Sequence, residues 1–103
     1  MSVENWRKKV DEVDAALLLL LNQRAGYSRE IGLIKKELGL AGYDQSREQE
    51  ILEALEALNR GPLSDKAVHR LFERILDESR RLVEQVLLEH QAQQASRATE
   101  NTR

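Results

Sequence analysis

The feature that most constrains the fold is an amphipathic pattern that runs without a proline from about residue 3 to residue 38. Its apolar residues recur in steps of three and four, which is the periodicity of one helix face. They include Val3, Trp6, Val10, Val13, Leu17, Leu20, Leu21, Tyr27, Ile31, Ile34 and Leu38. The pattern predicts a single helix about 54 Å long, with Gly39 placed to cap its end.

A helix of this length does not fit within a compact domain built from 103 residues. Such a domain has a diameter of roughly 35 Å, so the helix would extend beyond it. The run 15–21 is also apolar throughout, and at about 100° per residue it covers the whole circumference of the helix. We therefore expect two long helices to pack together in a homodimer. The alternative is a four-helix monomer in which this helix breaks near Gly26.

Two further helices are predicted after the long one. The second begins near residues 44–46 and ends at 59–62, and Ser64 is a good N-cap for the third. Their apolar stripes are Ile51, Leu52, Leu55 and Leu58, then Val68, Leu71, Phe72, Ile75, Leu76, Leu82, Val83, Val86 and Leu87. From about Gln91 the sequence becomes polar and loses its period. We expect one domain at 1–91 and a polar, disordered tail at 92–103.

Composition favours an all-α fold and excludes several classes of function. Threonine occurs only in the tail, and leucine and glutamate dominate. The chain has no cysteine, which excludes disulfides, zinc–thiolate sites and thiol nucleophiles. Its net charge of −2 argues against nucleic-acid binding, and its apolar runs are too short to cross a membrane. No secretory pattern opens the sequence, so we expect a cytoplasmic protein.

Several charged residues interrupt the apolar stripe of the long helix. Arg24 and Lys35 are separated by about 20° around the helix axis, and Ile31 shares their face, with Ser28 at its border. Cations on a packed face need a partner or a bound anion. Arg7 lies about 25 Å from Arg24 along the axis. In an antiparallel dimer it is placed to reach the partner's pocket.

The other two helices add polar residues that can share this pocket. Asp44, Arg47 and Glu48 precede Ile51 at the spacing of one helix face, and Ser79 interrupts the apolar face of the third helix. Singly, each has an ordinary structural explanation, such as an N-cap for Asp44 or a helix-dipole contact for Lys35. Jointly they predict one pocket for a small polyanion that also carries a hydroxyl group.

Five stretches of the sequence carry a resemblance to a known family. They are 6–14, 20–24, 30–35, 43–48 and 71–79. In this order and spacing they resemble the all-helical AroQ class of chorismate mutases, over nearly the whole chain except the tail. The resemblance implies a three-helix protomer that intertwines with its twin into a six-helix homodimer. It also implies an isomerase that converts chorismate to prephenate in phenylalanine and tyrosine biosynthesis.

The resemblance assigns a role to each pocket residue. Arg24 and the partner chain's Arg7 bind the two carboxylates of chorismate, and Lys35 bonds a carboxylate and the ether oxygen. Glu48, with Asp44, holds the ring hydroxyl. The rest of the wall is Arg47, Ser79, Ile31 and Leu76. A pericyclic rearrangement needs binding and charge stabilisation, so we expect no metal and no other cofactor.

The chain departs from the family pattern at Val83. The family usually has a Gln or Glu here, one turn after Ser79, which donates a second hydrogen bond to the ether oxygen. Glu84 follows, but it is rotated by about 100° and enters the pocket only if the helix changes register. Loss of one such donor costs on the order of 100-fold in rate. We therefore expect a slow mutase, or a regulatory module that docks onto another enzyme of the shikimate pathway.

Three other interpretations remain open at this point. An isochorismate pyruvate lyase shares the fold and the cationic pocket, but that group tends to lack the Asp-x-x-Arg-Glu pattern found at 44–48. The second interpretation is a non-catalytic helical dimer that serves as an adaptor, and Val83 is the one feature that supports it. A plain coiled coil is disfavoured because Arg24 and Lys35 interrupt the apolar stripe.

Overall fold

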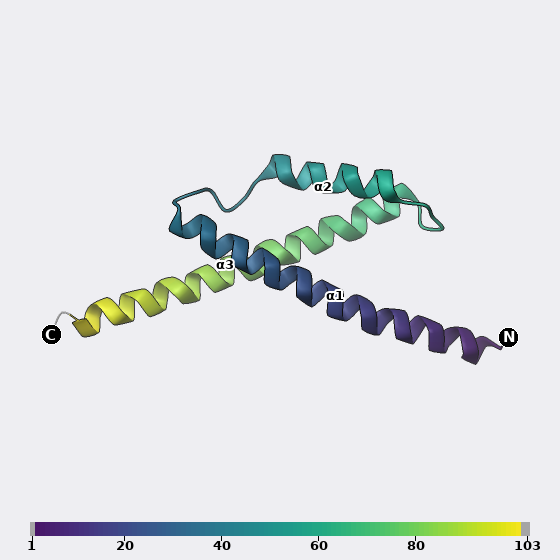
Figure 1. Cartoon of the computed structure of the whole chain (residues 1–103), viewed down its shortest axis with the longest axis horizontal. Coiled ribbons are helices and arrows are strands. Elements are labelled where there is room, and N and C mark those ends of the chain that lie inside the picture. The colour runs from purple at the N-terminus through teal and green to yellow at the C-terminus, as the bar shows by residue number, and fades with distance from the viewer. Residues whose placement is uncertain (1, 102–103) are drawn as a thin grey trace.

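Three α-helices make up the computed structural model of the chain, which describes residues 2–101 (Figure 1). They are α1 (Val3–Glu37), α2 (Gln45–Leu58) and α3 (Asp65–Asn101). The described residues contain no strand, and none of their helices carries an apolar stretch suited to crossing a membrane. The predicted all-α class and the three predicted helices are confirmed.

A polar side chain caps the start of each helix, and Ser64 caps the third helix as the sequence predicts. The side chains of Ser2, Asp44 and Ser64 each accept a hydrogen bond from the backbone N–H three residues ahead, at 3.3, 3.1 and 3.1 Å. These bonds satisfy donors that have no partner inside the helix. After α1, Gly39 has a φ of 70°, in the left-handed region that glycine adopts without steric cost. The chain can therefore turn there and return to start α2.

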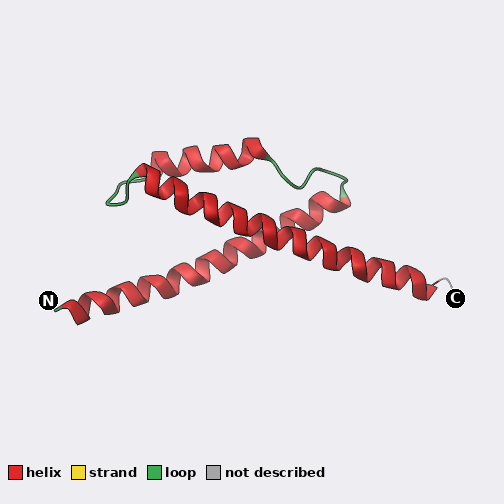
Figure 2. Cartoon of the chain, turned by 180° about the vertical axis from the view of Figure 1, so that it is seen from behind, coloured by secondary structure: helices red, strands yellow, loops and turns green. Residues whose placement is uncertain are grey.

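The helices α1 and α3 cross in an X, and α2 packs along α3 on one side of the crossing (Figures 1 and 2). Gly32 of α1 is buried at this crossing, and a methyl group on its Cα would overlap Cγ1 of Val83 on α3. Only glycine lets the two helices approach this closely. Leu76 of α3, at 5% exposure, is the one buried apolar side chain among the described residues.

The N-terminal half of α1 has no cover within the protomer. All described side chains from residue 2 to residue 23 are exposed, and Leu19 is 72% exposed. The radius of gyration is 18.9 Å, against about 13 Å for a compact domain of 100 residues. The chain exposes 8666 Å², whereas a compact protein of its mass exposes about 5,900 Å². Because α1 continues unbroken through Gly26, the four-helix monomer is excluded.

The structure differs from the sequence prediction beyond Gln91. α3 continues as a helix to Asn101, so the prediction of a disordered tail is wrong for residues 92–101, and residues 102–103 lie outside the described part. Glutamine, alanine and arginine are good helix formers. Losing the apolar period therefore removes the packing face of the helix and leaves its helix propensity intact. The domain boundary at residue 91 stays a prediction.

We expect Gly32→Ala to lower the free energy of unfolding by about 1–3 kcal/mol, because its methyl group overlaps Val83 and overpacking costs about that much. Gly26→Ala is the matched control on the same helix. Nothing lies within 4 Å of its added methyl group, and alanine favours a helix over glycine by about 0.5–1 kcal/mol. Urea unfolding at one protein concentration compares the variants. A Gly32→Ala variant as stable as the parent would contradict the close approach.

Candidate active site

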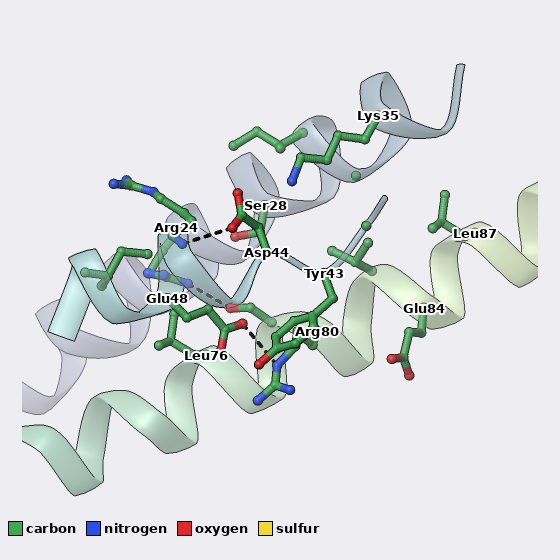
Figure 3. Close-up of a pocket in the computed structure, with 17 residues that line it drawn as sticks. Arg24, Ser28, Lys35, Tyr43, Asp44, Glu48, Leu76, Arg80, Glu84 and Leu87 are labelled. Carbon is green, nitrogen blue, oxygen red and sulfur yellow. Dashed lines mark hydrogen bonds and ion pairs between the residues drawn. The ribbon is translucent and has the colours of Figure 1, made fainter. Parts of the chain in front are cut away.

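A pocket of about 380 Å³ opens between the C-terminal part of α1, the start of α2 and the middle of α3 (Figure 3). This volume lies within the range of small-molecule sites. The lining residues are Arg24, Ser28, Ile31, Gly32 and Lys35 from α1; Gly42, Tyr43, Asp44, Arg47, Glu48 and Ile51 from the loop and α2; and Leu76, Ser79, Arg80, Val83, Glu84 and Leu87 from α3. All three helices therefore contribute to one cavity.

The structure brings together every candidate residue that the sequence places in the pocket, with the exception of Arg7. Arg7 lies near the start of α1 and does not line the pocket, and its guanidinium pairs with Glu4 at 2.9 Å. Its side chain is exposed. Within one protomer Arg7 therefore does not contribute to the site, as the helix length predicts.

The basic side of the pocket comes from α1. The Arg24 Nη1 group donates a hydrogen bond of 2.8 Å to Oγ of Ser79, which ties α1 to α3. Lys35 is half-buried, and its side-chain amine makes no hydrogen bond or ion pair with residues 2–99. Its amine extends toward Ser28 and Asp44 (Figure 3). A partly buried cation without a carboxylate partner is available to an anionic ligand.

The acidic side comes from the first turn of α2. Asp44 caps the helix, so its position is set by the backbone hydrogen bond described above. Glu48 lies one turn later, its side chain is only 20% exposed, and its Oε2 is 3.2 Å from Nε of Arg80. Arg47 turns outward and pairs with Glu50 at 3.3 Å. The carboxylate of Glu48 is an acceptor placed for a ligand hydroxyl.

The wall at Val83 is apolar, because this side chain packs against Gly32. α3 is a continuous α-helix through this region. The change of register that would bring Glu84 inward does not occur. Glu84 is exposed at the rim of the pocket, and its carboxylate points away from Lys35 (Figure 3). In this protomer Lys35 therefore has no second donor beside it on this wall.

Sequence reasoning missed Arg80 and gave no role to Tyr43. Both line the pocket, and the Arg80 guanidinium lies 5.0 Å from the centre of the Tyr43 ring. Helical spacing could have placed Arg80 in the pocket. Arg80 follows Leu76 by four residues and precedes Val83 by three, so the three residues share one face of the helix. Those two neighbours were both assigned to the pocket wall.

The histidines lie outside this pocket. His69 lies between Glu56 and Glu73, at 3.1 and 2.6 Å, and does not line the pocket. Among the described residues, no three His, Cys, Asp or Glu side chains are grouped as metal ligands. The pocket's own polar groups are cations, carboxylates and the hydroxyls of Ser28, Tyr43 and Ser79, which can bind, orient and stabilise charge.

This fold and site define a class of helical protein whose pocket sets cations from one long helix against carboxylates from a short one. Such an arrangement suits a small organic anion that also carries a hydroxyl group. The chain belongs to the chorismate mutase type II family, whose sequence profile matches residues 6–84. The resemblance drawn from the sequence is thereby confirmed.

Two curated relatives illustrate the range of this family. The chain is 39% identical over 72 residues to a bifunctional chorismate mutase/prephenate dehydratase from Neisseria gonorrhoeae, a match that covers 70% of this chain and 19% of that protein. It is 29% identical over 86 residues to a chorismate mutase from Methanocaldococcus jannaschii, covering 82% and 87%. The chain thus spans about a fifth of the bifunctional relative and most of the archaeal one.

Solved structures of chorismate mutases are also similar to this chain. A chorismate mutase from Thermus thermophilus is similar with a TM-score of 0.78 and 41% identity, covering 80% of this chain and 93% of that one. A chorismate mutase from Helicobacter pylori in complex with prephenate is similar with a TM-score of 0.78 and 32% identity, covering 84% and 94%. Both similarities extend over most of each chain.

Proposed function

We propose that this chain is a chorismate mutase that converts chorismate to prephenate. The observation that carries the proposal is the grouping of Arg24, Lys35 and Glu48 in one pocket, from two different helices, in a chain of the chorismate mutase type II family. The prephenate complex of the similar Helicobacter pylori enzyme supports the same reaction product.

The proposed mechanism uses position and charge. Chorismate carries two carboxylates, an ether oxygen and a ring hydroxyl. Arg24, held by Ser79, binds one carboxylate, and Lys35 bonds a carboxylate and the ether oxygen. Glu48 accepts the hydrogen bond of the hydroxyl, with Asp44 beside it. These contacts hold the enolpyruvyl arm over the ring, where one C–C bond can form as one C–O bond breaks.

Lys35 then does the electrostatic part of catalysis. Negative charge grows on the ether oxygen as the C–O bond breaks, and a fixed ammonium group at that oxygen stabilises the transition state more than the ground state. Arg47, Ile31 and Leu76 complete the wall around the substrate. The reaction proceeds without a nucleophile, a metal or another cofactor.

The proposed assembly is a homodimer in which two protomers intertwine into a six-helix unit. The chain exposes about 2,800 Å² more than a compact protein of its mass. That excess is in the range of obligate interfaces. The surface to be covered includes Leu18 and Leu19, which are 63% and 72% exposed. In an antiparallel pair, the partner's Arg7 reaches the pocket and binds the second carboxylate.

Val83 bears on the rate of the proposed reaction and on whether the chain acts alone. Val83 leaves Lys35 without a second donor, which favours a slow enzyme or one that docks onto another enzyme of the shikimate pathway. The bifunctional relatives support such a partner, since their names join this activity to a prephenate dehydratase. The lyase alternative is less favoured because Asp44, Arg47 and Glu48 all line the pocket.

We expect Arg24→Ala to reduce prephenate formation at least 100-fold, because it removes the carboxylate contact and the bond to Ser79. Incubation with chorismate and identification of the product by chromatography tests this. Arg29→Ala is the matched control, since Arg29 is exposed on the same helix, pairs with Glu30 and lies outside the pocket. A parent protein that leaves chorismate unchanged, or that releases pyruvate from isochorismate, would contradict the proposed function.

Subunit complementation tests the role of Arg7. We expect Arg7→Ala and Arg24→Ala to be nearly inactive separately, and to recover up to about a quarter of the parent activity after subunit exchange. Half of the randomly formed dimers are mixed, and each mixed dimer has one intact site. Arg24→Ala exchanged with Ser79→Ala is the control, because both changes affect the same protomer's wall and no intact site forms. Equal recovery in the two mixtures, or none, would contradict a shared site.

We expect Val83→Gln to raise kcat/KM for chorismate by roughly 10- to 100-fold, because the amide supplies a second donor at the ether oxygen. Steady-state kinetics of the parent and the variant measure this. Val83→Leu is the control, because it changes the packing at Gly32 and adds no donor. If Val83→Gln is no faster than the parent, the apolar wall does not limit the rate.

A further inference from the structure

Arg80 is the basic residue that α3 contributes to the pocket lining, and neither the sequence pattern nor the proposed mechanism gives it a role. Its side chain lies between two parts of the site (Figure 3). Nε is 3.2 Å from Oε2 of Glu48 on α2, and the guanidinium lies 5.0 Å from the ring centre of Tyr43 in the preceding loop. Nη2 is 3.7 Å from Asp77 on its own helix.

The contact with Glu48 places one oxygen of that carboxylate. The Glu48 side chain is 20% exposed, and a largely buried carboxylate needs a compensating charge or donor. Within residues 2–101, Arg80 is the cation that pairs with it. Nε of Arg80 is itself buried and makes the contact as an ion pair, without hydrogen-bond geometry. Oε2 is thereby held against α3, and Oε1 is left for a ligand.

The contact with Tyr43 places the loop before α2. Tyr43 directly precedes Asp44, the N-cap of α2. A guanidinium over an aromatic ring is attracted by the negative face of the ring and stacks on it. Arg80 therefore connects both the entry to α2 and its first turn to α3, which also carries Ser79. Within the described part of the chain, its neighbour Arg81 makes ion pairs only with Asp77 and Glu78 on α3.

We propose that Arg80 is a positioning residue that orients the Glu48 carboxylate toward the ring hydroxyl of the substrate. The proposal rests on the proposed function, because it assigns Arg80 to the hydroxyl side of the same site. Arg80 acts through Glu48 and does not itself contact the reacting atoms. Its contribution therefore depends on the presence of an ionised carboxylate at position 48.

A double-mutant cycle tests this dependence. Arg80→Gln keeps much of the side-chain volume and removes the charge. We expect it to lower kcat/KM for chorismate roughly tenfold in the parent and by less than about twofold in the Glu48→Gln background. Arg80→Lys restores a cation and should recover part of the loss. Arg81→Gln, which removes the same charge from the adjacent position, should stay within about twofold of the parent.

The outcomes separate a positioning role from a structural one. A loss of similar size in both Glu48 backgrounds would show that Arg80 only supports the fold, and would overturn the proposal. So would an Arg80→Gln variant that matches Arg81→Gln. If Arg80→Gln fails to fold, the same cycle is measured with Arg80→Lys. If the parent and Arg81→Gln both leave chorismate unchanged, the proposed function itself fails, and the role of Arg80 fails with it.

Discussion

The close approach of α1 and α3 at Gly32 and Val83 is the contact on which the rest of the protomer depends. It is the point where a glycine lets the two long helices approach closely, and it lies on the pocket wall. Arg24 lies about two turns before Gly32 on α1, and Ser79 about one turn before Val83 on α3. The crossing therefore sets the geometry in which these two side chains form their 2.8 Å hydrogen bond.

The pocket divides its charges between helices. α1 contributes Arg24 and Lys35, while the first turn of α2 contributes Asp44 and Glu48. This separation suits a substrate with carboxylates on one side and a hydroxyl on the other, because each helix can be placed for one kind of contact. It also means that the position of α2 decides the hydroxyl contact. The ion pair between Glu48 and Arg80 and the contact of Arg80 with the Tyr43 ring therefore matter for the hydroxyl contact, although they lie at the edge of the pocket.

The sequence predicted the parts of the structure that are set locally. Apolar period and caps located all three helices, and rotation along α1 grouped Arg24, Ile31 and Lys35 correctly. The functions of Gly32 and Arg80 depend on which residue of another helix lies opposite, and one sequence holds little information about that pairing. The helical course of residues 92–101 does not follow from the apolar pattern, because the polar residues there keep their helix propensity after the packing face ends.

Val83 shows why packing and catalysis compete at this crossing. A β-branched residue has a stiff side chain that fills the space beside a glycine, and so fixes the distance between the helices. A glutamine at the same position is longer and more flexible, but it supplies a donor. In the proposed mechanism one position must serve both needs, since the crossing lies on the wall that faces the ether oxygen. Val83 therefore keeps the crossing rigid but gives no hydrogen bond to the ether oxygen. In the proposed mechanism, Lys35 alone stabilises the negative charge on that oxygen.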